Sequence, residues 1–143
     1  MSLPSDRLAR STVGGDVDLD LANATDRFEF VEIACEKTCS SGERFAGRYR
    51  GIGLADLFDA FDPDTTHLLV ESADGFRVCV SIRDASDGVL ALERLDTRAG
   101  PDELPRLVSP SLSATRFVRN VATIEGRRLS SSIDPGTLER LRR

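Results

Sequence analysis

Apolar and polar residues alternate along several short stretches of this chain, a pattern typical of β-strands that bury one face. These stretches are rich in β-branched and aromatic residues, which favour strands. Asp74 and Gly75 separate two of them, and an Asp-Gly pair is a strong signal for a tight hairpin. We therefore expect a protein built mainly from strands, with a hairpin near its centre. The predicted strands span residues 16–21, 28–35, 66–72, 76–82, 89–95 and 116–124.

Helical spacing of apolar residues is confined to short segments. Leucines and phenylalanines recur three or four residues apart ahead of Pro63, and they predict a helix that begins near Gly53. Residues 83–88 predict a single helical turn, whereas the polar, glycine-containing stretch 38–47 predicts a loop. Because strands are interspersed with short helices and no repeat occurs, we predict an α+β fold of mixed, mostly-β type.

The C-terminal residues predict one further helix. Asp134 suits its N-cap and Pro135 its first turn, while Leu138 and Leu141 would form its apolar face. A small serine-rich linker precedes this helix. We therefore expect residues 129–143 to form a linker and helix that follow the main domain.

The length of 143 residues fits a single domain. We expect a loose tail over residues 1–14 and a folded domain over residues 15–128. No stretch approaches the roughly 18 apolar residues that a membrane span needs. The N-terminal residues contain no apolar signal region, so we expect a cytoplasmic protein with no membrane partner.

The charge balance disfavours one class of partner. The formal net charge is −5, and nucleic-acid binding depends on a surplus of Lys and Arg to contact phosphates. We therefore expect no nucleic-acid partner. The balance does not exclude a small anionic substrate, since a local group of arginines can still attract one.

Three cysteines and one histidine carry the candidate chemistry. The odd number of cysteines does not predict a disulfide framework, and the spacing of the cysteines and the histidine does not predict a zinc site. Cys35 is either a small buried apolar residue or a reactive thiol, and Cys35 with Cys39 would form a possible redox pair. Cys79 is expected to pack against a helix or another sheet. His67 is expected to be structural, because no serine or acid partner is placed beside it by the sequence.

A basic cluster follows Cys35 in the sequence. Arg44, Arg48 and Arg50 would steer an anion into a cleft near this cysteine. The alternative is a solvated loop whose charges are neutralised by Glu36 and Glu43.

Three segments of the chain carry a resemblance to a known family. The first contains Cys35 and Arg50, and the second contains the hairpin. The first is Ile33-Ala34-Cys35, followed after a polar loop by Tyr49-Arg50-Gly51-Ile52-Gly53-Leu54. It is similar to a cysteine that precedes a Trp-x-Gly-Val-x-Leu pattern, with Tyr49 in place of the tryptophan. The second segment is the hairpin 67–82 with the helical turn and strand that follow it.

The third segment is Pro105-Arg106-Leu107-Val108-Ser109-Pro110, with Arg116-Phe117-Val118-Arg119-Asn120-Val121 behind it. It resembles a Leu-Arg-x-x-x-Pro strand followed by a Val-Lys-Trp-x-x-x-Ile strand. In this order, the three segments resemble the molybdopterin-binding domain of the sulfite oxidase family, over about residues 28–126 of the expected domain.

The resemblance implies a molybdopterin-dependent oxidoreductase that acts on a small oxyanion or oxide. Cys35 would be the catalytic thiolate that binds the molybdenum, since a soft sulfur donor suits a metal already held by dithiolene sulfurs. Arg116 and Arg50 would bind the cofactor, with Arg116 on its phosphate. The sequence departs from the family in its short N-terminal part and in the segment 111–115, which lacks the family's glycine. The alternative is therefore a cofactor-free relative that serves as a binding or assembly module.

Overall fold

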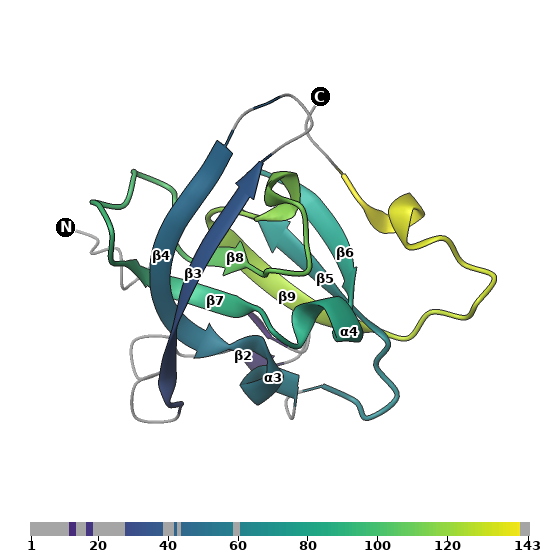
Figure 1. Cartoon of the computed structure of the whole chain (residues 1–143). Helices are drawn as coiled ribbons and strands as arrows, with labels where there is room; N and C mark the ends of the chain where they lie inside the picture. The colour runs from purple at the N-terminus through teal and green to yellow at the C-terminus, as the bar shows by residue number, and fades with distance from the viewer. Residues whose placement is uncertain are drawn as a thin grey trace.

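The computed structural model describes residues 12–13, 17–18, 28–38, 42, 44–58 and 61–140, and strands dominate this part of the chain (Figure 1). The strands are β1 (Thr12–Val13), β2 (Val17–Asp18), β3 (Phe30–Thr38), β4 (Arg44–Gly53), β5 (His67–Ser72), β6 (Arg77–Ser81), β7 (Val89–Arg94), β8 (Arg106–Val108) and β9 (Val121–Arg127). The helical elements are α3 (Leu54–Leu57), α4 (Ile82–Ala85) and the 3-10 turns η3 (Ala114–Arg116) and η4 (Pro135–Leu138).

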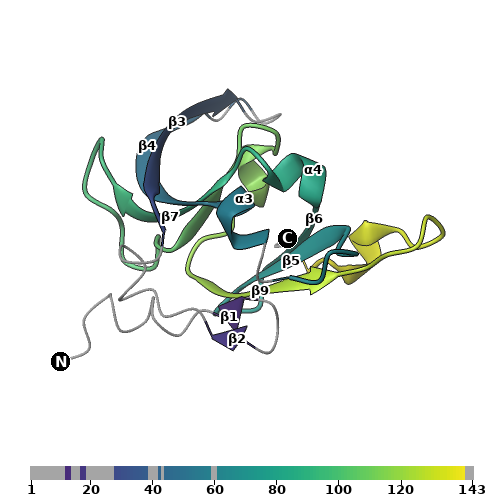
Figure 2. The same ribbon diagram turned by 90° about the horizontal axis from the view of Figure 1, so that it is seen from below.

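The strands form two sheets. One sheet has the order β3-β4-β7-β8, and its long β3–β4 hairpin curls over the core as part of a half-barrel (Figure 2). The other has the order β2-β1-β9-β5-β6 and is antiparallel except where β1 runs parallel to β9. The predicted mostly-β character with short helices is confirmed. None of the described helices is long and apolar enough to cross a membrane.

The predicted central hairpin is confirmed. β5 and β6 pair in antiparallel register from His67↔Ser81 to Glu71↔Arg77. Gly75 lies in the turn with a φ of 94°, a left-handed conformation that glycine adopts without strain. The helical turn α4 and strand β7 follow the hairpin, as the sequence predicted.

Strand β4 was missed, because the sequence predicted a loop over residues 38–47. In the structure, β3 and β4 pair continuously from Phe30↔Ile52 to Thr38↔Arg44. Arginines and glycines in β4 lower its apparent strand propensity and hide the alternation. Gly51 is required where β7 approaches closely, since a Cβ there would stand 2.1 Å from the backbone oxygen of Leu90.

Three other predicted elements have different bounds. The helix predicted from Gly53 is only the turn α3, which is enough to bury Leu54 and Leu57. The late strand begins at Val121 instead of Arg116, because Asn120 has a φ of 51° and interrupts the extended chain. Of the strand predicted at 16–21, β2 covers two residues and the rest lies outside the described residues.

The predicted C-terminal helix is present over its described part only as the short 3-10 turn η4. Asp134 accepts a hydrogen bond from the backbone N–H of Gly136, but only the 3-10 turn η4 follows. The chain is extended again at Glu139. Leu141 lies outside the described residues.

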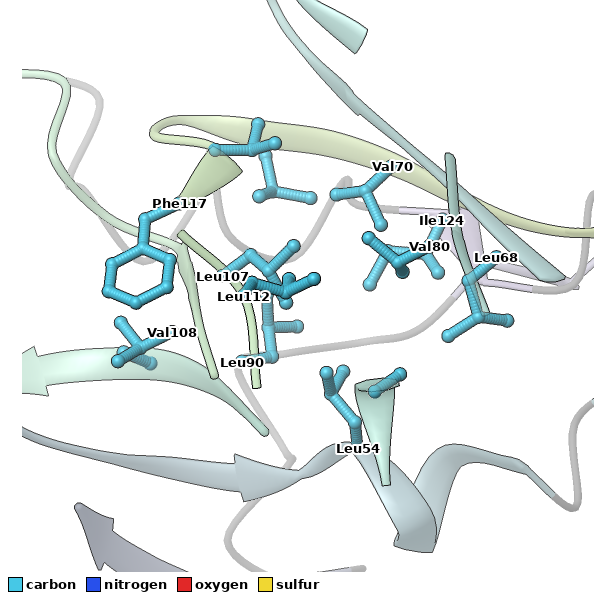
Figure 3. Close-up of a cluster of buried hydrophobic side chains, with 14 of the residues drawn as sticks. Leu54, Leu68, Val70, Val80, Leu90, Leu107, Val108, Leu112, Phe117 and Ile124 are labelled. Carbon is cyan, nitrogen blue, oxygen red and sulfur yellow. The ribbon is translucent and has the colours of Figure 1, made fainter. Parts of the chain in front are cut away.

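The hydrophobic core lies between the two sheets (Figure 3). Leu68, Val70 and Ile124 face it from one sheet, while Leu90 and Leu107 face it from the other. Burying these side chains on both inner faces supplies the main driving force for packing the sheets together.

Candidate functional site

Cys35 lies inside the fold and not at a surface opening. It is opposite Gly47 on the inward face of the β3–β4 hairpin, where its side chain is 6% exposed and belongs to the same apolar cluster as Tyr49 and Phe117. Burial raises the pKa of its thiol, and Lys37 offsets this only in part. The environment therefore favours the neutral thiol over the thiolate, which is the metal-binding form.

Arg50 and Cys35 face opposite sides of the hairpin. The exposed arginines of β4 alternate with inward residues, and each pairs with a nearby glutamate. A terminal guanidinium nitrogen of Arg50 lies 3.7 Å from Glu93 Oε1, and the guanidinium stacks over the ring of Phe30. Arg50 and Cys35 therefore cannot contact one ligand at this place in the sheet. The other pairs of this outer face are Arg44–Glu36 and Arg48–Glu32, while Glu43 lies outside the described residues.

The third predicted site residue, Arg116, lines a pocket of about 410 Å³. Ser111 and Ser113 line the same pocket from the segment that precedes Arg116. His67 and Cys79 reach it from β5 and β6. The structure thus brings Arg116 together with the segment 111–115 and with the single histidine, but Cys35 does not line this pocket. We call it the Arg116 pocket.

The guanidinium of Arg116 is hydrogen-bonded to the buried carboxylate of Glu139. Both terminal nitrogens of Arg116 donate to Glu139, and the backbone N–H of Cys79 donates to Glu139 Oε2 at 2.8 Å. The side chain of Glu139 is 6% exposed, and that of Arg116 is 31% exposed. Two planar charged groups in this fork arrangement give strong, charge-assisted hydrogen bonds.

Glu139 reaches the pocket on a segment that we call the C-terminal strap, residues 134–140. The strap runs beside the free edge of β6 (Figure 1). Arg77 and Arg140 exchange two backbone hydrogen bonds of 2.9 Å, and Arg77 Nε donates to the backbone oxygen of Leu138 at 2.7 Å. The strap thereby covers a sheet edge and places a carboxylate against Arg116.

Cys79 is joined to the strap through its backbone N–H, which donates to Glu139 at 2.8 Å, and it lines the Arg116 pocket together with Pro135 of the strap. The predicted packing of its side chain against a helix or another sheet stays a prediction. Its side chain is buried, and this burial raises the pKa of its thiol. The charge of Glu139 raises the pKa further, while Arg116 and Arg127 lower it. Cys79 is therefore a weakly reactive thiol as long as the strap is in place. Cys39, which would form the predicted redox pair with Cys35, lies outside the described residues.

His67 is the first residue of β5, and its Nδ1 lies 2.9 Å from Thr66 Oγ1. Within the described part of the chain, no hydrogen bond joins His67 to a serine or a carboxylate. The pocket therefore does not contain an assembled pair of nucleophile and base.

A second pocket, of about 350 Å³, lies beside the loop between β7 and β8. Asp102 and Asn120 line it, and both have positive φ angles, of 68° and 51°. Glu103 also lines it but is fully engaged in hydrogen bonds. Glu103 Oε2 accepts from Tyr49 at 2.6 Å, and Arg94 contacts both carboxylate oxygens.

This buried network was missed by the sequence analysis. Arg106 and the backbone N–H of Gly100 complete the set of donors to Glu103, at 3.3 and 3.0 Å. Burial raises the pKa of Glu103, but hydrogen bonds from Tyr49, Gly100 and Arg94 outweigh it and hold the pKa below its ordinary value. No local pattern signals the network, since Tyr49 and Glu103 are 54 residues apart.

Comparison with known proteins adds no assignment: no protein-family model matches the chain, and no curated protein matches it.

Proposed function

We propose that this domain is a binding module for a small ligand with an anionic group, held in the Arg116 pocket. The observation that carries the proposal is the double hydrogen bond from Arg116 to the carboxylate of Glu139, assisted by the N–H of Cys79. These donors already hold two oxygens of an anion, and both Arg116 and Cys79 line a pocket of ligand size. A phosphate or a carboxylate presents the same pair of oxygens.

The chemistry of the surrounding side chains supports this choice. Ser81, Ser111 and Ser113 line the pocket beside Arg116, and their hydroxyls are hydrogen-bonded within the chain to Asp84, Asp87 and Thr115. Hydroxyl groups donate to or accept from the polar parts of a ligand. An arginine fork adds both charge and a planar orientation, which a single ammonium group does not. The pocket therefore suits a ligand with one anionic end and further polar groups.

The relation to the molybdopterin-binding domain of the sulfite oxidase family remains part of this proposal. It is supported by the hairpin β5–β6, which is followed by α4 and β7 as the resemblance requires. Arg116 and its neighbours would suit the phosphate end of such a cofactor. The cofactor-free alternative is the form of the relationship that these residues favour.

The surroundings of Cys35 do not fit a metal held by a pterin. Its sulfur is enclosed by apolar side chains, its pKa is raised, and it does not line the Arg116 pocket. We therefore assign no redox step to Cys35. Metal analysis of protein made in a molybdopterin-producing host tests this choice. We expect parent and Cys35→Ser to contain equally little molybdenum or tungsten, whereas metal retained by the parent and lost from the variant would support the oxidoreductase hypothesis.

Titration with inorganic pyrophosphate, followed by amide NMR shifts, tests the proposed site. We expect saturable shifts at Cys79 and along residues 111–116, and at least about tenfold weaker binding by Arg116→Gln, since a charge-assisted fork is lost. Arg44→Gln is the matched control, because Arg44 pairs with Glu36 on the outer face of the other sheet. Equal binding by parent and Arg116→Gln, or no binding by either, would overturn the proposal.

A further inference from the structure

The C-terminal strap holds an internal anion in the pocket that the proposed function assigns to an external one. Glu139 is the residue involved, and its carboxylate uses both the Arg116 fork and the N–H of Cys79. A ligand phosphate that bound to Arg116 would need the same donors. The two anions therefore cannot occupy the fork together.

The charges around the pocket also favour competition between Glu139 and an external anion. Among the described residues that line the pocket, Arg116 is the one arginine or lysine, and Asp84 is an acid that lines it too. With Glu139 paired to Arg116 and Asp84 in the lining of the pocket, the negative charge beside the guanidinium disfavours the approach of a further anion. With Glu139 displaced, a ligand anion takes over the role of the carboxylate and the balance around Arg116 is preserved.

The strap is held by contacts that can open without disturbing the core. None of its residues, 134–140, belongs to the hydrophobic core cluster. Its anchors are the backbone bridge between Arg77 and Arg140, the bond from Arg77 to Leu138, and Glu139 itself. Segments with little apolar burial open at much lower free energy than the core. Release of the strap would therefore leave both sheets intact.

We propose that the C-terminal strap is a displaceable competitor: the carboxylate of Glu139 closes the anion site, and a ligand anion binds by displacing it. This inference rests on the proposed function. It means that the parent protein binds its ligand with only the fraction of molecules in which the strap is open, so its apparent affinity is lower than that of the exposed site.

The experiment compares pyrophosphate affinity in full-length parent, Glu139→Gln and Glu36→Gln. Glutamine keeps the shape of the side chain but loses the charge that competes for Arg116. We expect Glu139→Gln to bind about tenfold more tightly than the parent. Glu36→Gln, which removes a glutamate from an exposed arginine pair, is expected to bind as the parent does.

A second variant weakens the strap from outside the pocket. Arg77→Gln removes the side-chain bond to Leu138 and leaves Arg116 and Glu139 unchanged. We expect a smaller rise in affinity, of about threefold. Dispersed amide spectra confirm that each variant is folded. If Arg116-dependent binding is equally tight in the parent, Glu139→Gln and Arg77→Gln, the competitor inference fails while the proposed function stands.

The thiol of Cys79 gives a readout that needs no ligand. Arg77→Gln loosens the strap but keeps Glu139, whose charge raises the pKa of Cys79, so alkylation of Cys79 by iodoacetamide should be faster in Arg77→Gln than in the parent if the strap opens. Cys35 serves as the internal control, since it lies in the core away from the strap. Unchanged labelling of Cys79 would show that the strap does not open, and would overturn the inference. Faster labelling without any pyrophosphate binding would overturn the proposed function and the competition together, while leaving a mobile strap.

Discussion

Glu103 and Glu139 are buried to the same extent, with 6% of each side chain exposed, yet they are held in different ways. Glu103 lies on the loop between two strands of the half-barrel and receives hydrogen bonds from three side chains and one backbone N–H. Glu139 lies on the strap and receives them from Arg116 and one backbone N–H. Burial alone therefore does not distinguish a structural carboxylate from an exchangeable one; the number and origin of its donors do.

The surroundings of the two acids explain the difference. Arg94 stacks over the ring of Tyr49, and Arg106 stacks over that of Phe45, so the donors to Glu103 are themselves packed into the core. Moving Glu103 would take away the carboxylate paired with Arg106 and leave Arg94 with Asp96 alone. Of the two donors to Glu139, Arg116 is 31% exposed, which gives an external anion the access that the proposed displacement requires.

The largest expected effect comes from removing the charge of Glu103. Glu103→Gln leaves Arg94 and Arg106 only partly compensated, and Arg106 Nε is already buried without a hydrogen-bond partner. We expect a loss of about 3–5 kcal/mol in the free energy of unfolding, as for a broken buried pair. Urea unfolding followed by circular dichroism measures it. A loss below about 1 kcal/mol would show that the network is dispensable and that the comparison with Glu139 does not hold.

Lowering the pH should remove part of the stabilisation that ionised Glu103 gives to the folded protein. The pKa of Glu103 is lower in the folded protein, so the unfolded chain takes up the proton first as the pH falls. The stabilisation is therefore complete above the unfolded value of about 4.3 and decreases as the pH drops toward the folded value. Asp96, whose pKa is lowered to about 2 by Arg94, acts in the same direction.

Comparing the parent with Glu103→Gln separates the pH-dependent stabilisation due to Glu103 from that due to Asp96. We expect the parent to lose more unfolding free energy between pH 5 and pH 3 than Glu103→Gln, because the variant keeps Asp96 but lacks the titrating group. Identical losses would mean that Glu103 has no lowered pKa.

The comparison also shows which parts of the molecule could be predicted. The β5–β6 hairpin was predictable because its alternation and its Asp74-Gly75 turn are local signals. Arg116 and its neighbours were singled out by resemblance, and they do line one pocket. The hairpin and the segment 111–116 consist of residues that are close in the sequence, whereas His67 and Cys79 reach the pocket from elsewhere in the chain.

Features that depend on distant residues could not be predicted. Strand β4 is specified by its pairing with β3 and β7, not by its own glycine- and arginine-rich composition. Asp134 and Pro135 predicted the start of a helix, and a short 3-10 turn does begin there, but nothing in the sequence near them indicates docking onto β6. Glu139 meets Arg116 across 23 residues, so neither side chain identifies the other.

A smaller effect is expected at Tyr49, whose hydroxyl is one donor among several to Glu103. Tyr49→Phe should cost about 1–2 kcal/mol, the usual range for a buried hydrogen bond to a charged group. Urea unfolding measures this loss as well. A loss as large as that of Glu103→Gln would mean that the hydroxyl, and not the ion pairs, holds the network.

The parent protein allows an independent check on the same hydroxyl. Burial, followed by the hydrogen bond to Glu103, raises the pKa of Tyr49 to about 12. The chain has one tyrosine and no tryptophan, so phenolate absorbance reports on Tyr49 alone. We expect a midpoint near 12 while circular dichroism shows a folded protein. A midpoint near 10 in the folded state would contradict the buried hydrogen bond.

The smallest effect is expected on the outer face of the β3–β4 hairpin. Arg44 and Glu36 form an ion pair in which both side chains are 62% exposed, so water and salt screen their attraction. Glu36→Gln should change the free energy of unfolding by less than about 0.5 kcal/mol, and added salt should reduce even this difference. Urea unfolding at low and high ionic strength measures both. A loss above about 1 kcal/mol would contradict this expectation, because an exposed pair would then stabilise the fold as much as a buried contact does. It would also remove Glu36→Gln as a neutral control for Glu139→Gln, since the two substitutions are chemically identical and differ only in how deeply the carboxylate is buried and what holds it.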